Sequence, residues 1–148
     1  MILGTGIDIV DIKRIDDVYK KFGDNFAKKI LFDSEVDEYN NIKIKYKNDY
    51  NKIISFLAKH WAVKEAVSKA VGCGLINGSP LHFKDIILTH NNLNAPNIAI
   101  TDNLKYIIEK IYNVKDFNNN VVKIHISTSS DSGFIVASAI LELRNKCD

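Results

Sequence analysis

The sequence is poor in the residues that mark specialised classes of protein. Its 148 residues include only two prolines, seven glycines and two cysteines. Cys73 and Cys147 have neither the CxxC spacing of a zinc site nor the cysteine density of a secreted disulfide scaffold. They fit a reducing compartment, so we expect a cytoplasmic protein. The chain does not open with a basic region and an apolar run, so no signal peptide is expected.

Net charge and long apolar runs are also scarce. The net charge is +2, and no apolar stretch approaches the length of a membrane-spanning helix. We therefore expect no nucleic-acid partner and no membrane partner. Arg14 and Arg144 are the only arginines among twenty basic residues. Arg14 is of interest because lysine does not replace arginine at a fork-shaped contact.

The length and composition are those of one domain. A chain of 148 residues with 46% hydrophobic content can bury most of its apolar surface without disulfides or a structural metal. No internal repeat, linker or low-complexity segment divides it. We expect a single domain over residues 1–148.

The apolar segment at the start of the chain predicts a strand. Gly4 and Gly6 lack side chains, so this strand is expected to pass close to other backbone. The two-residue period of a strand places Asp8 on the face opposite Ile7 and Ile9. A carboxylate in such a segment is a candidate functional residue.

Residues 51–71 predict a long helix. Asn51 can cap it, and Gly72 with Gly74 can end it. Its apolar stripe consists of Ile54, Leu57, Ala58 and Trp61 and continues into Glu65, Ser68 and Lys69. Folding alone would not select Glu65 on that stripe, because burying an unpaired carboxylate is costly.

Shorter elements are expected along the rest of the chain. They are a helix capped by Asp11, an amphipathic piece at 26–32, a helix from a Ser34–Asp37 capping box toward Ile44, strands near 85–90 and 97–101, a helix at 102–112, and two antiparallel strands at 121–127 and 134–143 joined by a turn at 128–133. The polar stretch 43–51 can be helix or loop. Together these elements predict an α+β fold with one long helix packed on a small antiparallel sheet.

Glu65 and Lys69 stand four residues apart on one helical face. The simplest interpretation is a surface salt bridge worth a few tenths of a kcal/mol. The apolar stripe, the glycine loop that follows and the second carboxylate at Asp8 favour a site instead. Mg²⁺ commonly takes one or two protein carboxylates together with water and substrate phosphate, and a nearby lysine can neutralise further phosphate charge. The sequence therefore predicts a Mg²⁺ site for chemistry on a phosphate ester.

Three motifs, in order, resemble those of the holo-(acyl-carrier-protein) synthases, which are short 4′-phosphopantetheinyl transferases. They are Gly6-Ile7-Asp8-Ile9-Val10 followed by Arg14-Ile15, the run from Phe56 to Gly74 with Lys64-Glu65-Ala66 at its centre, and His125-Ile126-Ser127. The segment from Leu31-Phe32 to Glu35 and Tyr39 is similar to a further helical segment of that family. The resemblance extends from residue 2 to about residue 143.

The resemblance implies an enzyme that moves the phosphopantetheine arm of coenzyme A onto a serine of an apo acyl carrier protein. It implies that Asp8 and Glu65 ligate Mg²⁺, that Lys69 stabilises charge on the pyrophosphate, and that Arg14 and Lys21 contact the acidic carrier. It also implies a homotrimer with active sites between subunits. The residues expected to bind coenzyme A are His60, Lys64, Ser68, Lys69, Gly72, Gly74, His125 and Ser127.

Several of these residues also have an ordinary structural interpretation. Lys21 can be part of a solvated helix face, the two glycines can simply end a helix, and His125 can be half-buried in a strand. The family usually carries arginine where this chain has His60, and histidine where it has Ser129-Ser130. Both departures weaken possible phosphate contacts, although Lys59 could compensate for the first.

Two other functional classes compete with this hypothesis. A non-catalytic carrier-binding or nucleotide-binding protein could retain the fold, and His60 with Ser130 supports that alternative. A different Mg²⁺-dependent phosphotransferase, such as a nucleotide hydrolase, is weakened by the absence of a GxxxxGK[ST] loop.

Overall fold

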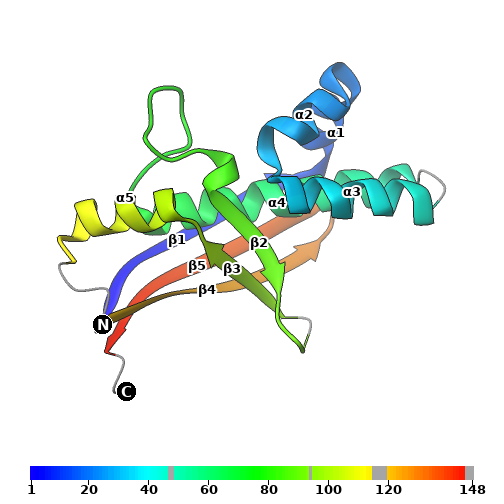
Figure 1. Ribbon diagram of the computed structural model, residues 1–148. Coiled ribbons are helices and arrows are strands. Elements are labelled where there is room, and N and C mark those ends of the chain that lie inside the picture. The colour runs from blue at the N-terminus through cyan, green and yellow to red at the C-terminus, as the bar shows by residue number, and fades with distance from the viewer. Residues whose placement is uncertain (47–48, 94, 115–119, 146–148) are drawn as a thin grey trace.

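The structure is a computed structural model and describes residues 1–46, 49–93, 95–114 and 120–145 (Figure 1). Its elements are β1 (Ile2–Asp11), α1 (Ile12–Phe22), α2 (Asp24–Ile30), α3 (Asp33–Lys45), α4 (Tyr50–Val71), a 3₁₀ turn η1 (Phe83–Asp85), β2 (Ile86–His90), β3 (Pro96–Ile100), α5 (Asp102–Tyr112), β4 (Asn120–Asp131) and β5 (Phe134–Asn145).

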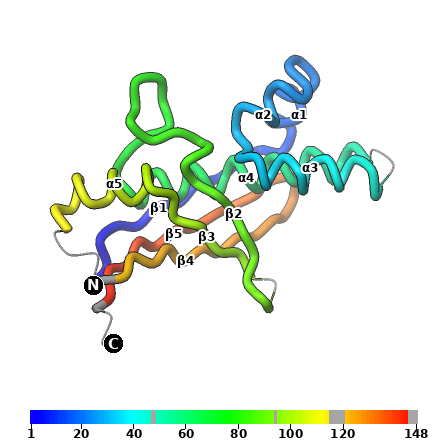
Figure 2. The backbone as a smooth tube through the Cα atoms, in the orientation of Figure 1, coloured from blue at the N-terminus to red at the C-terminus, as the bar shows by residue number. Residues whose placement is uncertain are grey.

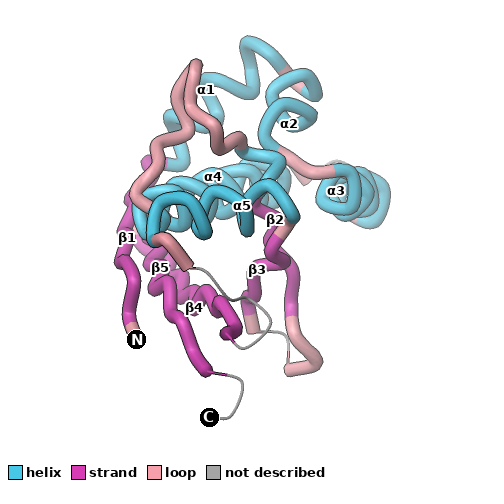
Figure 3. Tube along the Cα trace, turned by 60° about the vertical axis from the view of Figure 1, so that its left-hand side comes forward, coloured by secondary structure: helices cyan, strands magenta, loops and turns pink. Residues whose placement is uncertain are grey.

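The sheet and the long helix form two layers. β1, β5 and β4 make an antiparallel three-stranded sheet in that order, and β2 and β3 make a separate hairpin. The helices gather on one side of the three-stranded sheet (Figure 3). Buried residues of α4 form the centre of the core, among them Leu57, Ala58, Ala62, Val63, Ala66 and Val67, each 0% exposed. The expected α+β fold with a long helix on an antiparallel sheet is confirmed.

β1 lies directly against the backbone of α4. A Cβ atom on Gly4 would lie 2.0 Å from the Ala70 carbonyl oxygen, and one on Gly6 would lie 2.0 Å from the Ala66 carbonyl oxygen. No side chain fits at such distances, so only glycine permits this approach. The prediction that this strand passes close to other backbone is confirmed. The approach also determines how far Asp8 is from α4.

β1 runs along β5 in a tube view, and its start lies next to the last part of β5 (Figure 2). Ile2 pairs with Glu142, and the backbone amide of Leu143 donates to the Met1 carbonyl oxygen at 2.8 Å. The register then places Asp8 opposite Ala137, which is 0% exposed. Asp8 therefore lies on the face of the sheet that α4 covers.

The outer face of the three-stranded sheet is partly apolar. Ile7 and Ile9 are each 64% exposed, and Ile140 on the neighbouring strand is 40% exposed. The predicted alternation along β1 is confirmed, but the isoleucines point away from the core. The inner positions instead hold Gly4, Gly6, Asp8 and Val10, because the backbone of α4 leaves no room for larger side chains there.

Some element boundaries differ from the predictions. α4 is capped by Asp49, whose carboxylate accepts from the Lys52 amide, and not by Asn51. α3 begins at Asp33, and the carboxylate of Glu35 caps it by accepting from the Phe32 amide. Both ends of the polar stretch 43–51 are helical, up to Lys45 in α3 and from Tyr50 in α4; residues 47–48 lie outside the described part of the chain.

The turn predicted at 128–133 is shorter than expected. β4 continues to Asp131, which pairs with Phe134, so the hairpin has a two-residue turn. Ser132 and Gly133 both have positive φ, 50° and 84°. Such a turn matches the twist of the two strands and lets pairing continue to its edge. Within the described ranges, no helix is long and apolar enough to cross a membrane.

Candidate metal and phosphate site

Asp8 and Lys69 are in direct contact although they are far apart in the sequence. The Nζ of Lys69 donates to Oδ1 of Asp8 at 2.9 Å and to the Ile7 carbonyl oxygen at 3.0 Å. The Asp8 side chain is 14% exposed and that of Lys69 is 50% exposed. An ammonium group has three N–H donors, so one remains for a ligand on the solvent side.

Glu65 lies beside this pair on α4 and is half-buried. Burial raises the pKa of the Glu65 carboxyl, and the negative charge of Asp8 raises it further. The positive charges of Lys69 and Arg14 oppose the shift. The structure thus brings together Asp8, Glu65 and Lys69, with Arg14 close enough to act on Glu65 electrostatically.

Two mutually repelling carboxylates in a partly buried place form a donor set suited to a divalent cation. Among the residues that the structure describes, no group of three or more His, Cys, Asp or Glu side chains could hold a metal. A pair of carboxylates fits Mg²⁺, which takes few protein ligands and completes its shell with water and substrate phosphate. It does not fit the closed ligand sets of structural zinc.

The loop after α4 adds accessible backbone near Lys69. α4 ends at Val71 and is capped by Gly72, which has a φ of 79°, and the Cys73 amide donates to the Ser68 carbonyl oxygen at 3.0 Å. Gly72 and Gly74 are both exposed. The predicted helix end is confirmed, and it leaves a glycine backbone that a phosphate or nucleotide could approach closely.

Three residues expected to bind coenzyme A are buried instead. His60 is 1% exposed, and Lys64 and Ser68 are 0% exposed. Ser68 donates back to the Glu65 carbonyl oxygen at 2.9 Å within α4. Lys64 Nζ is 2.6 Å from Glu35 Oε2, and burial lowers the pKa of the Lys64 ammonium while Glu35 opposes that shift. These side chains cannot reach a ligand in this structure, so we leave them out of the proposed coenzyme site.

His60 is a neutral imidazole in the core. Its Nδ1 lies 2.9 Å from the Phe56 carbonyl oxygen and must be the donor, because a carbonyl only accepts. Burial lowers the pKa of His60 to about 3. Among the described residues its Nε2 has no hydrogen-bond partner, and it lies 3.7 Å from Glu35 Oε1. His60 therefore supplies no cation for a phosphate, unlike the arginine that the resemblance places here.

His125 and Ser127 lie on the outer face of the sheet. Val122 and Ile124 of β4 are buried against the core, and the alternating positions face the other way. His125 Nε2 is 2.6 Å from Glu142 Oε2 on β5. Within one chain these two residues are therefore on the opposite side of the sheet from Asp8 and Glu65. They could join such a site only in a neighbouring copy.

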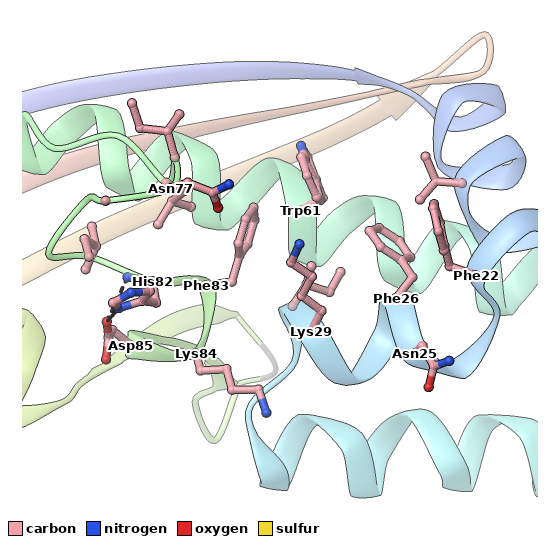
Figure 4. Close-up of a pocket in the computed structure, with 16 residues that line it drawn as sticks. Phe22, Asn25, Phe26, Lys29, Trp61, Asn77, His82, Phe83, Lys84 and Asp85 are labelled. Atoms are coloured by element: carbon pink, nitrogen blue, oxygen red, sulfur yellow. Dashed lines mark hydrogen bonds and ion pairs between the residues drawn. The ribbon is translucent and has the colours of Figure 1, made fainter.

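Arg14 and Lys21 are exposed on α1, as expected, and α1 borders an apolar cleft. The cleft has a volume of about 890 Å³ and lies between the α1–α2 corner and the segment 75–85 (Figure 4). Phe83, Trp61, Phe26 and Phe22 follow one another along it in Figure 4. Lys29 and Lys84 also belong to its lining. Sequence reasoning missed this cleft, because it assigned Trp61 to the apolar stripe of a core helix.

Glu35 was also missed as a residue with a role of its own. It is 1% exposed, and its partner Lys64 is 29 positions away in the sequence. Local periodicity carries no signal for such a pair. The only indication in the sequence that Glu35 has a role is that it belongs to the segment that is similar to a helical segment of the family.

Comparisons with a family model and with the sequences of known proteins indicate the same family. A family model described as the 4′-phosphopantetheinyl transferase superfamily matches residues 4–130. A holo-[acyl-carrier-protein] synthase of Wigglesworthia glossinidia brevipalpis is 36% identical over 141 residues, which are 95% of this chain and 92% of the relative. The enzyme of that name from Vibrio cholerae (strain ATCC 39541) is 32% identical over 144 residues, 97% of this chain and 100% of the relative.

Solved structures agree with these relatives. The crystal structure of holo-[acyl-carrier-protein] synthase from Neisseria meningitidis has a TM-score of 0.77 and 32% identity, covering 96% of this chain and 99% of that one. The Helicobacter pylori enzyme in complex with coenzyme A has a TM-score of 0.67 and 29% identity, covering 93% and 99%. The fold that the motifs implied is confirmed, and the chain belongs to the 4′-phosphopantetheinyl transferase superfamily.

Proposed function

We propose that the protein transfers the 4′-phosphopantetheine group of coenzyme A to a serine of an apo acyl carrier protein and releases adenosine 3′,5′-bisphosphate. Near full-length similarity to holo-[acyl-carrier-protein] synthases supports this reaction, and two similar structures contain coenzyme A or its 3′,5′-ADP part. The observation that carries the proposal for this chain is the contact between Lys69 and Asp8 beside Glu65. The cytoplasmic location expected from the cysteines is part of the proposal.

In the proposed reaction, the carrier serine oxygen forms a bond to the phosphorus nearest pantetheine. The bond from that phosphorus to the bridging pyrophosphate oxygen breaks, and the oxygen leaves with the adenosine bisphosphate. One carboxylate of the site accepts the serine proton. Lys69 offers its remaining N–H to the pyrophosphate, where negative charge accumulates on the leaving group. Positioning and charge neutralisation supply most of the rate enhancement in such transfers.

Asp8 and Glu65 would hold Mg²⁺, which supplies neutralisation of pyrophosphate charge when it is bound. The raised pKa of Glu65, caused partly by Asp8, supports this assignment because a cation would relieve the repulsion between the two carboxylates. Lys69 then orients Asp8 through its hydrogen bond to Oδ1. We propose Lys69, Gly72 and Gly74 as the coenzyme-binding groups of the same chain.

We further propose a homotrimer, in which His125 and Ser127 of one subunit contribute to the coenzyme site of another. The exposed isoleucines Ile7 and Ile9 and the position of His125 on that same outer sheet face support this assembly. Sedimentation equilibrium should give three times the 16.7 kDa chain mass. Ile9→Lys should give a monomer that has lost transfer, because a charge cannot be buried unpaired in an apolar interface.

A matched control for that substitution is Ile44→Lys. Ile44 is 77% exposed on α3, away from the outer face of the sheet. This variant should keep the assembled mass and the activity. A monomeric wild-type protein with full transfer activity would refute the trimer.

Arg14 and Lys21 are proposed to contact the acidic carrier. Replacing either with alanine should raise the KM for the carrier roughly 3- to 10-fold at low ionic strength, and the difference should shrink as salt is added. Steady-state kinetics at two salt concentrations measure this. Lys110→Ala on the exposed side of α5 is the control, since it removes the same charge elsewhere. An unchanged KM for both variants would remove α1 from the carrier-binding surface.

The direct test is incubation with apo acyl carrier protein, coenzyme A and Mg²⁺, followed by mass spectrometry of the carrier. We expect the mass of one phosphopantetheine to be added, and chelation of the metal to stop the reaction. Coenzyme binding without transfer, under conditions where a known transferase succeeds, would instead indicate a non-catalytic binding protein. Hydrolysis of a nucleotide without carrier modification would indicate another phosphotransferase.

A further inference from the structure

A buried ion pair lies next to the apolar cleft but outside the proposed metal site. Glu35 of α3 and Lys64 of α4 are 1% and 0% exposed, and Lys64 Nζ lies 2.6 Å from Glu35 Oε2. Among the described residues, neither side chain forms a hydrogen bond or ion pair with Asp8, Glu65 or Lys69. Neither can reach a substrate, so any role in the reaction must act through other residues.

The two walls of the cleft are α2 and the segment 75–85, which contains the start of η1. Lys64 binds one residue of each wall. Its Nζ donates to the Ile30 carbonyl oxygen at 2.8 Å and to the Phe83 carbonyl oxygen at 3.0 Å. Ile30 ends α2 and Phe83 begins η1, and both line the cleft from different segments of the chain. The third N–H goes to Glu35, so every donor of the ammonium is used.

Glu35 binds one further backbone amide next to each wall. Its Oε2 accepts from the Phe32 amide at 2.7 Å, just after α2, and its Oε1 accepts from the Leu88 amide at 2.8 Å, in β2 just after η1. The pair thus holds four backbone groups, two in or just after α2 and two in or just after η1. All four bonds are to main-chain atoms, so they fix the positions of the segments themselves.

Stability alone is a poor explanation for such a pair. Replacing a buried ion pair with apolar residues of similar volume is often neutral or stabilising, because desolvation offsets much of the attraction. What a charged pair adds is directional geometry, since each bond holds only at a defined distance and angle.

We infer that Lys64 and Glu35 are positioning residues that fix the separation of the two walls of the cleft, and so its width around Trp61. The consequence for catalysis rests on the proposed function: α1, which carries Arg14 and Lys21, borders the cleft, so its width affects docking of the carrier. The coenzyme loop at Gly72 and Gly74 makes no bond to Lys64. Loosening the walls therefore weakens carrier binding and leaves coenzyme binding unchanged.

Trp61 is the only tryptophan in the chain and reports on this cleft directly. Its ring centroid lies 4.7 Å from that of Phe83 and 5.8 Å from that of Phe26, one on each wall. In the double variant Lys64→Met with Glu35→Gln, both charges are removed and volume is approximately kept. We expect its Trp61 emission to move to longer wavelength and acrylamide quenching to increase, with an unchanged far-UV circular dichroism spectrum.

Kinetics provide the second measurement. The KM for the carrier should rise by roughly 3- to 30-fold, the scale of couplings through residues that do not touch a ligand, while the KM for coenzyme A stays the same. The control is Leu141→Ala, a core residue of β5 that is 0% exposed and does not line the cleft. It should lower the unfolding midpoint without moving Trp61 emission or the carrier KM.

Lys64→Gln with Glu35→Gln is the second variant, and it decides the matter if the first does not fold. Its amides can re-form part of the hydrogen-bond set, so both readouts should fall between those of the wild type and of the methionine variant. Wild-type values of emission and carrier KM in the folded variants would overturn the inference. If the wild type itself transfers no phosphopantetheine, the proposed function fails, while the comparison of Trp61 emission still tests the positioning role.

Discussion

Asp8→Asn and Glu65→Gln are each expected to lower kcat for phosphopantetheine transfer by at least about 100-fold, the scale of losing one group that stabilises transition-state charge. Both substitutions keep the shape of the side chain and remove its charge. Lys69 can still donate to an amide oxygen at position 8, so the local hydrogen bond is not lost with the charge. The loss should therefore appear in activity and not in folding.

The stability of Glu65→Gln should move in the opposite direction from its activity. Burial and the negative charge of Asp8 both raise the pKa of Glu65, so removing the Glu65 charge relieves both costs in the metal-free protein, whereas Asp8→Asn also loses the ion pair with Lys69. Mg²⁺ with coenzyme A should raise the melting temperature of the wild type and should have little effect on either variant. The double variant should be about as impaired as the worse single variant, because both carboxylates act on one ion.

Glu38→Gln provides the matched control for this prediction. Glu38 is an exposed carboxylate on α3, and its removal changes the net charge by the same amount. Turnover and the response to Mg²⁺ should match those of the wild type. Full activity of Glu65→Gln at the same Mg²⁺ concentration would show that this carboxylate is not a metal ligand.

Local periodicity was sufficient to predict most of the elements and the shared helical face of Glu65 and Lys69. The helix at 102–112 is found with the predicted bounds, and the strand alternation around Asp8 is as expected. Glu65 and Lys69 share a face because their spacing matches the helical repeat. The two glycines of β1 correctly indicated a close backbone approach, since a missing side chain is itself a packing signal.

The errors come from contacts between distant parts of the chain. Lys64 and His60 were expected to bind coenzyme A because they belong to the same motif as Glu65. Their side chains lie on the face of α4 that packs against Glu35 and the core. Adjacent residues of a helix point about 100° apart, so nearness in a motif is not nearness in space. The two-residue period placed Ile7 and Ile9 on one face of β1 but could not say that this is the outer face, because neighbouring elements decide which face of a strand is covered.

Gly6→Ala is expected to disrupt both the fold and the site. Its added methyl carbon would lie 2.0 Å from the Ala66 carbonyl oxygen and 2.6 Å from the Ala70 amide nitrogen. Both are main-chain atoms of α4, so no change of rotamer can relieve the contact. The strand and the helix must separate, and we expect a loss of about 2–5 kcal/mol in the free energy of unfolding, measured by urea denaturation.

Separation would also act on the chemistry, because β1 carries Asp8 and α4 carries Glu65 and Lys69. The 2.9 Å bond between Lys69 and Asp8 cannot survive a movement of about 1 Å, and a misplacement of that size can cost about 100-fold in rate. The folded fraction of Gly6→Ala should therefore transfer phosphopantetheine about 100-fold more slowly than the wild type.

Gly74→Ala is the control for the stability measurement. A methyl carbon there would meet only Ile76 Cγ1 at 3.9 Å, an ordinary contact, and Gly74 does not have a positive φ. Its free energy of unfolding should change by less than about 0.5 kcal/mol. If Gly6→Ala were equally harmless, α4 and β1 would not be in backbone contact, and the distance between the two carboxylates would have to be set by something other than these glycines.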